Sequence, residues 1–226
     1  LIISIALMIF SFPAPILLAI CLDNIPRQGF KRAAQTISYL PHFISWVVMA
    51  GLVYRLLDTD TGIVNYIIRS LGCDPIPFMR TPSMFLPIVI IVDILKEVGW
   101  NSIIFLAAIT NIDSSLYEAA RIDGAGKLKC IWYITLPGIG PTIGTMLILR
   151  VGSMVNVNFD MIFNLKNPMI DSVANVLGTF VYEQGILWGK FSYATAVGMV
   201  QGLISVILVF ITMKAANKVS GESYIV

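Results

Sequence analysis

The chain has 226 residues, of which 57% are hydrophobic and 12% charged, and its formal net charge is +2 at pH 7. A soluble domain of this size cannot place so much apolar surface inside, so a water-soluble globular fold is excluded. The weak net charge gives no support to nucleic-acid binding. The composition therefore predicts an all-α polytopic membrane protein.

Five segments are long and apolar enough to cross a bilayer, which takes about 20 residues each. We expect Pro13 and Pro15 to kink the first one. This segment has no charged leader and no cleavage signal, so it is interpreted as a span rather than a signal peptide. We expect one further span before residue 1, and a single transmembrane domain over residues 1–226. The five segments are Leu1–Leu22, Ser38–Tyr54, Phe85–Ile109, Gly138–Val157 and Phe191–Met213.

The connections between these segments fall into two sets, one slightly basic and one slightly acidic. Basic residues collect on the cytoplasmic side of membrane proteins. This rule predicts that the basic set, which includes Glu118–Pro137, is cytoplasmic. The other set is then external. The basic residues of the cytoplasmic set are Arg27, Lys31, Arg32, Arg121, Lys127, Lys129, Lys214 and Lys218.

The two predicted external connections are Asp58–Ser83 and Phe159–Lys190. The first is rich in Gly and Pro turn signals, and between them Ile63–Leu71 is predicted to form a short helix on the membrane surface. The second is predicted to hold a helix over Val173–Tyr182. These connections are the surfaces open to an external partner.

Four charged residues lie inside predicted spans. Each would cost roughly 2.5–3.5 kcal/mol at the bilayer centre, so we expect them to face one another, a wet cavity or another subunit. An ion pair without any role in transport is the alternative. The four residues are Asp93, Lys96, Glu97 and Arg150, with Trp100 and Asn101 continuing the polar face of the third span and Asn156 and Asn158 that of the fourth.

No catalytic residue and no metal ligand is predicted. The three cysteines are far apart and show no metal-binding spacing. The only histidine, His42, lies in an apolar run and is interpreted as structural. The chain has no Gly-x-x-x-x-Gly-Lys-Ser/Thr loop, so it does not bind ATP by that device.

The most distinctive stretch is the polar segment Glu118–Pro141, EAARIDGAGKLKCIWYITLPGIGP. Ser115 with Glu118 three residues later fits a capping box at a helix start. Gly124 and Gly126 are predicted to break this helix, and a second one restarts near Lys127. The segment therefore predicts a helix, a glycine turn, and a second helix leading into an apolar span at Pro137.

These residues resemble the EAA loop of ABC-importer permeases. The match comprises Glu118, Ala119, Ala120, Gly124, Ile134, Leu136 and Pro137 at the family spacing, and Asp123, Ala125 and Pro141 extend it to the sugar-importer branch, the maltose-permease type. Cys130 departs from that branch, which more often has Phe there. The stretch Ser38–Trp46 is similar to polysaccharide importers, including those for uronate-containing oligosaccharides.

The resemblance implies a type I importer permease in a bacterial cell membrane and no enzymatic activity in this chain. Residues 113–137 would be the cytoplasmic coupling loop that docks on ATP-binding subunits, which would hold ATP and Mg. A second homologous permease, an external or periplasmic solute-binding protein and membrane lipid are the other implied partners. The charged spans would line the translocation path, where Trp100 would cover sugar rings and Arg150 or Lys96 would attract an acidic sugar.

Three alternatives remain open at this point. The same machine can carry another solute, such as a polyamine or an amino acid. An ion-coupled secondary transporter can use Asp93, Lys96 and Glu97 as a relay. An intramembrane enzyme is the third, although no pair of a nucleophile and a base is visible.

Overall fold

The structure is a computed structural model that describes residues 1–220, without side chains for 217–220, so Lys218 is described only as part of a helix. The described residues form helices and short turns, and no strand. The helices are α1 Ile2–Phe10, α2 Pro13–Asp23, α3 Gln28–Tyr39, η1 Leu40–Phe43, α4 Trp46–Leu56, α5 Ile63–Ser70, η2 Phe78–Arg80, α6 Pro82–Thr110, α7 Ser114–Ile122, α8 Lys127–Cys130, η3 Ile131–Thr135, α9 Leu136–Gly138, α10 Gly140–Gly152, α11 Phe159–Leu165, α12 Asp171–Ala174, α13 Leu177–Tyr182, η4 Glu183–Leu187 and α14 Phe191–Ser220.

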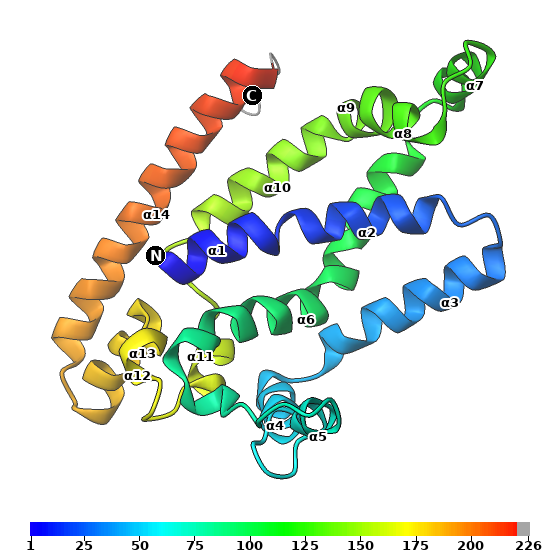
Figure 1. Cartoon of the computed structure of the whole chain (residues 1–226). Coiled ribbons are helices and arrows are strands. Elements are labelled where there is room, and N and C mark those ends of the chain that lie inside the picture. Colours follow the sequence, from blue (N-terminus) through cyan, green and yellow to red (C-terminus); the bar gives the residue numbers. More distant parts are fainter. Residues whose placement is uncertain (221–226) are drawn as a thin grey trace.

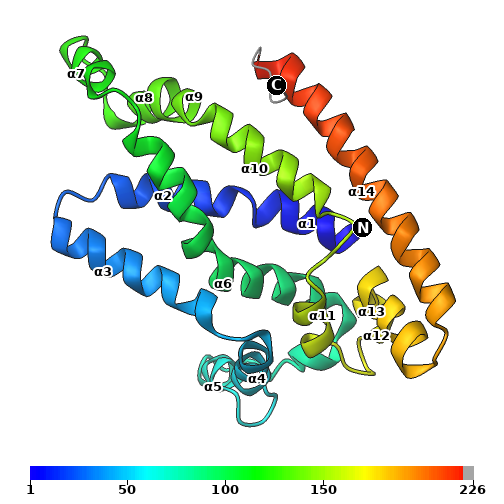
Figure 2. The ribbon, with the colours of Figure 1, turned by 180° about the vertical axis from the view of Figure 1, so that it is seen from behind.

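Helix α6 runs through the middle of the molecule, between α2 and α3, while α10 packs against α14 (Figures 1 and 2). Its first half, with Phe85 and Val89, belongs to one apolar cluster shared with α1, α4 and α11. Its last part, with Phe105 and Ile109, belongs to a second cluster shared with α2. The charged stretch of α6 therefore lies between two apolar clusters.

Two described stretches, Ile2–Asp23 and Phe191–Ala216, are long and apolar enough to cross a membrane, and two bent helix pairs qualify if each counts as one span. The first stretch is interrupted between Phe10 and Pro13, where we expected a kink. The predicted span Phe85–Ile109 lies within α6, a single helix of 29 residues.

The predicted span Ser38–Tyr54 is wrong as a straight helix. Residues Gln28–Phe43 and Trp46–Leu56 are separate helical stretches that meet at 101°. Ile44 and Ser45 are extended, and the Ser45 hydroxyl accepts a hydrogen bond from Val48 N at 3.3 Å, which starts α4 as a new helix. The predicted span took in the end of α3, a helix with several polar residues, whereas only α4 beyond the break is strongly apolar.

Two other predicted boundaries are wrong. The helix that begins the predicted span Gly138–Val157 ends at Gly152, because the chain turns there and Asn158 caps the next helix through Met161 N at 3.2 Å. The predicted helix Val173–Tyr182 is two short helices with extended residues between them. There the Thr179 hydroxyl accepts a hydrogen bond from Val176 N at 3.1 Å and restarts the helix.

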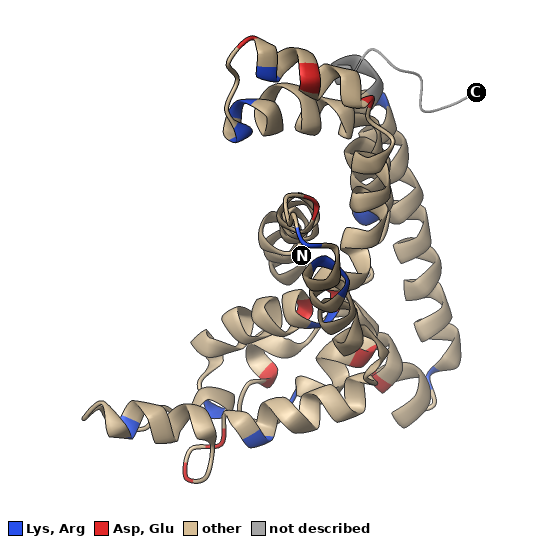
Figure 3. Cartoon of the chain, turned by 90° about the vertical axis from the view of Figure 1, so that its right-hand side faces the viewer, with Lys and Arg blue, Asp and Glu red and all other residues tan. Residues whose placement is uncertain are grey.

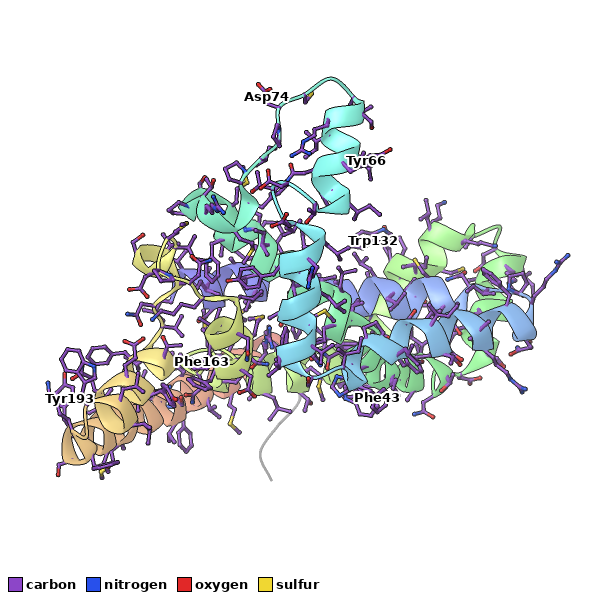
Figure 4. The ribbon with its side chains drawn as sticks, turned by 90° about the horizontal axis from the view of Figure 1, so that it is seen from below. Phe43, Tyr66, Asp74, Trp132, Phe163 and Tyr193 are labelled. Carbon is purple, nitrogen blue, oxygen red and sulfur yellow. The ribbon has the colours of Figure 1, made fainter. Side chains whose placement is uncertain are left out.

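The connections gather at two ends of the molecule. The loop with α7 and α8 lies at the upper right of Figure 1, whereas α4, α5 and α11 to α13 lie along its lower edge. The predicted short helix over Ile63–Leu71 is confirmed as Ile63–Ser70, while its place on the membrane surface stays a prediction. Its fully buried Asn65 donates to Ile76 O at 2.9 Å and accepts from Ile76 N at 2.8 Å, so Tyr66 and Asp74 project together from the body (Figure 4).

Candidate functional site

A polar hollow lies between α1 and α2 on one side and α6 and α10 on the other. It consists of two adjoining cavities of about 240 and 280 Å³. Asp93, Glu97 and Asn101 face it because they are four residues apart and so share one side of α6. The residues that line both cavities are Asp93, Glu97, Asn101, Arg150 and Ser153.

Asp93 is paired across this hollow with Arg150. The Asp93 Oδ2 atom lies 3.6 Å from Arg150 Nη2, and the Asp93 side chain is 8% exposed while that of Arg150 is 38% exposed. Arg150 thus neutralises a buried carboxylate and still presents part of its guanidinium to the hollow. Two charges that would each be costly in lipid offset one another here.

Glu97 is engaged on its other side by Lys96 and His42. Its Oε1 lies 3.3 Å from Lys96 Nζ and its Oε2 lies 2.8 Å from His42 Nδ1. Lys96 also donates to the His42 carbonyl at 2.6 Å and lies 5.1 Å from the centre of the Trp46 ring. No sequence pattern indicates His42 as a partner of Glu97, because the two are 55 residues apart.

Trp100 does not line either cavity. Its ring stacks on His42, with centroids 4.5 Å apart and planes at 2°, and the edge of Phe43 meets it at 5.7 Å. Asn101 continues the polar face of α6 into the hollow as expected, but Trp100 lies on the neighbouring face with Lys96. Trp100 therefore orients His42 instead of covering a sugar in these cavities.

Asn156 and Asn158 line the second cavity from the connection after α10, not from a helix face. Gln201 of α14, which is 6% exposed, donates its side-chain amide to Asn156 Oδ1 and to the Val155 carbonyl. This buried amide fixes the connection against α14. The sequence analysis did not identify Gln201 as a site residue, because a single glutamine in an apolar span forms no pattern.

The polar segment at 113–137 forms the predicted helix, turn and helix, with one correction at its start. The cap of α7 is Asp113, whose carboxylate accepts a hydrogen bond from Ser115 N at 2.9 Å, so the predicted capping box at Ser115 and Glu118 is wrong. That hydrogen bond also lowers the pKa of Asp113 below its ordinary value. Asp113 caps the helix in place of Ser115, because Asp113 stands directly before the first helical residue, where a capping acceptor is needed.

Gly124 makes the turn between the two helices. Its φ is +76°, a conformation that favours glycine. The turn is closed by hydrogen bonds from Ala125 N to Ala120 O at 2.8 Å and from Gly124 N to Arg121 O at 3.1 Å. The second helix continues through a π-helical turn, Ile131–Thr135, to Gly138 and then bends by 60° into α10.

The loop carries both basic and acidic residues (Figure 3), and several of its apolar side chains are exposed. Glu118, Ala119, Asp123, Gly124 and Pro137 are exposed, while Ala120, Ile134 and Leu136 are half-buried. A hollow of about 560 Å³ separates the loop from the α2–α3 connection. The exposed apolar side chains of this loop are Leu116, Ile122, Leu128, Trp132, which Figure 4 labels, and Tyr133.

Comparison with known proteins gives a family match over most of the chain. The family described as binding-protein-dependent transport system inner membrane component matches residues 11–222. The polygalacturonan/rhamnogalacturonan transport system permease protein YteP of Bacillus subtilis (strain 168) is 42% identical over 211 residues. That alignment covers 93% of this chain and 66% of YteP, so the chain spans about two thirds of this relative.

Two solved structures share the fold. A bacterial ABC transporter involved in the import of the acidic polysaccharide alginate superposes with a TM-score of 0.93 at 39% identity, over 96% of this chain and 76% of the other. A bacterial alginate ABC transporter in complex with an alginate pentasaccharide-bound periplasmic protein gives a TM-score of 0.95 at 38% identity, over 98% and 77%. The arrangement of α1, α6, α10 and the loop at 113–137 is thus that of an importer permease.

Proposed function

Because this chain belongs to the family of binding-protein-dependent transport system inner membrane components, we propose that it carries an acidic oligosaccharide across a bacterial cell membrane as one permease of an ATP-driven importer. The family and its sugar-transporting relatives favour this function over a polyamine or amino-acid permease. They also favour it over an ion-coupled transporter.

The polar hollow between α1, α6 and α10 is the observation that carries the proposal. Asn101, Asn156 and Asn158 offer amide donors and acceptors to sugar hydroxyls. The carboxylates of Asp93 and Glu97 are both engaged by basic groups. A hollow of this kind favours a hydroxyl-rich solute, because its charges are already paired and its amides can exchange partners with a passing chain.

The relatives indicate an acidic cargo. YteP is named for polygalacturonan and rhamnogalacturonan, and the two structural relatives are alginate transporters. Arg150 is the group in the hollow best suited to a sugar carboxylate, because a planar guanidinium binds carboxylates through paired hydrogen bonds. Its partial exposure leaves donors open to the hollow beside the Asp93 contact.

The loop at 113–137 is the proposed contact to the ATP-binding subunits. Its exposed apolar side chains suit a groove on a partner, and the glycine turn at Gly124 makes it narrow enough to insert. ATP and Mg would be held by those subunits and not by this chain. Glu118 is exposed on α7, where it is placed to contact the groove directly.

Transport then follows from the geometry of the two sites. A binding protein delivers the oligosaccharide to the external connections, and a second permease completes the pathway beside this chain. ATP binding moves the coupling loop, and α10 carries that movement to Arg150 in the hollow. The hollow then opens to the other side of the membrane, and hydrolysis resets it.

Uptake by proteoliposomes tests the proposal. The full-length chain, its ATPase, its second permease and its binding protein are reconstituted together, with oligogalacturonate as cargo and its neutral methyl ester for comparison. We expect uptake of oligogalacturonate that requires ATP hydrolysis and is unaffected by collapsing ion gradients. Uptake driven by an ion gradient without ATP would overturn the importer, and import of neutral cargo alone would overturn the acidic cargo.

A further inference from the structure

The Glu97 side chain lines the hollow, but its carboxylate oxygens are held by two residues that line neither cavity. Each of these oxygens has one partner, Lys96 Nζ at 3.3 Å and His42 Nδ1 at 2.8 Å. A carboxylate oxygen only accepts hydrogen bonds, so Nδ1 of His42 carries the hydrogen. The direction in which Glu97 presents its charge therefore depends on His42.

The His42 ring is held in this orientation by three contacts. It stacks on Trp100 at 4.5 Å, Phe43 meets it edge-on at 5.6 Å, and its own carbonyl accepts from Lys96 Nζ at 2.6 Å. It also lies on η1, next to the 101° break between α3 and α4. These contacts of the His42 ring and backbone keep its Nδ1 donor in one place.

The charges around the hollow explain why the His42 donor matters for an acidic cargo. Asp93 is matched by Arg150 and Glu97 by Lys96, so these four groups sum to zero, and His42 adds a further donor to the Glu97 side. A carboxylate that turned into the hollow would repel a negatively charged sugar. A protein rejects or admits such a solute largely through contacts of like charge.

We propose that His42 is a specificity-determining residue, which holds the Glu97 carboxylate away from the hollow so that an acidic oligosaccharide meets Arg150 and not a free carboxylate. This inference rests on the acidic cargo proposed above. A simpler role for His42, packing the break between α3 and α4, predicts different results in a double-mutant cycle.

The test measures ATP-dependent uptake of oligogalacturonate by proteoliposomes of the complete importer. We expect His42→Leu to reduce uptake by about tenfold, the size expected for the repulsion between a Glu97 carboxylate that turns into the hollow and a negatively charged sugar, at a distance of roughly 10 Å and an effective dielectric constant of about 20. His42→Asn keeps a donor near the same place and should restore most of the rate. Glu97→Gln removes the charge that needs the donor, so its uptake rate is the reference for the double variant.

The decisive variant is His42→Leu combined with Glu97→Gln. It should behave like Glu97→Gln alone, because the charge that His42 restrains is gone. Leu40→Ala is the matched control, since Leu40 lies on the same short helix η1 and its side chain is exposed; its uptake should stay near the wild type. Co-purification with the ATPase confirms that each variant assembles.

The outcomes separate this inference from the proposed cargo. If the wild type imports oligogalacturonate and His42→Leu is equally slow with and without the added Glu97→Gln substitution, His42 is only a packing residue and the inference is overturned. If His42→Leu does not assemble, failure of His42→Asn to import at near wild-type rate overturns it equally. If the wild type does not import oligogalacturonate at all, the cargo assignment itself fails.

Discussion

Tyr117 Oη and Thr135 Oγ1 lie 2.9 Å apart, so the first helix of the proposed coupling loop is joined by a side-chain hydrogen bond to the π-helical turn that leads into α10. Thr135 is 5% exposed. The same α10 carries Arg150 into the polar hollow at its other end. A force on α7 therefore has a direct side-chain route to the helix that contacts the proposed cargo.

Tyr117→Phe removes this hydrogen bond and keeps the ring. Losing one such bond costs about 1 kcal/mol, which corresponds to roughly a fivefold effect on a coupled step. We expect import to fall by that factor while the ATPase activity of the complex is maintained. Tyr133→Phe is the control, because Tyr133 is 80% exposed, and it should leave the ratio of import to hydrolysis unchanged.

The turn of the coupling loop gives a second prediction. Gly124 has φ of +76° and donates its N–H to Arg121 O at 3.1 Å, and proline can supply neither feature. Gly124→Pro should abolish import, and Glu118→Lys should do so through the reversed charge at the ATPase groove, while the membrane helices stay folded.

Gly126→Ala is the matched control for the turn. Gly126 has φ of −75°, and an added methyl group there would meet no atom within 4 Å. Import by this variant should equal that of the wild type. Normal import by Gly124→Pro would remove the coupling role from this loop.

The ion pair across the hollow gives a third prediction. Arg150→Met leaves Asp93 as a buried, uncompensated carboxylate. Breaking a buried pair costs about 3–5 kcal/mol, but the partial exposure of Arg150 reduces this to roughly 1–3 kcal/mol. The melting temperature of the purified complex should fall, and adding Asp93→Asn should restore most of it. Equal melting of both variants would show that the pair contributes nothing.

The membrane class and the helix, turn and helix of residues 113–137 follow from the sequence, because each rests on a local pattern. The cost of a charge in lipid predicted that the charged residues would face one another, a wet cavity or another subunit, but it did not predict which residues pair. The structure pairs Asp93 with Arg150. The break at Ile44 and Ser45 was not predicted, because the predicted span joined the polar end of α3 to the apolar α4 as one run. The contact between His42 and Glu97 depends on that break, so the sequence did not predict this contact either.

The connection Phe159–Lys190, which the sequence predicts to be external, gives a pH prediction. Lys166 Nζ lies 2.7 Å from Asp171 Oδ1 and 2.6 Å from Glu183 Oε1, and it ties α11 to α12 and η4. Burial acts to lower the pKa of Lys166, but the hydrogen bonds and charges of the two carboxylates outweigh it and raise the pKa above the ordinary 10.5. A raised lysine pKa means that the stabilisation is complete below the ordinary value and is lost as pH rises through the folded-state value.

Lys166→Met should therefore lower the melting temperature at pH 8 by about 2–4 °C, the shift expected for about 1 kcal/mol in a chain of this size. The difference from the wild type should shrink above the raised pKa, where the wild-type ammonium is deprotonated. Lys190→Met serves for comparison, because Lys190 contacts the Gln184 amide and the Trp188 ring, both of which are uncharged. A difference that stays constant into strong alkali would argue for lost packing instead of lost charge.

The packing of α3 on α6 gives the last prediction. Gly99 lies beside the backbone of Ser38, and a methyl group added at Gly99 would overlap the Ser38 carbonyl. Backbone atoms cannot yield as a flexible side chain does, so Gly99→Ala should destabilise the chain by about 1–3 kcal/mol and push α3 away from α6. Because η1 follows α3 directly, His42 should move with it and release Glu97, so import should fall with stability.

Gly51→Ala, in the neighbouring α4, would meet no atom within 4 Å and should leave stability and import unchanged or slightly improved. The test measures melting temperature and uptake for both variants. If Gly99→Ala equals Gly51→Ala in both quantities, the close approach of α3 and α6 is not what holds His42 in place.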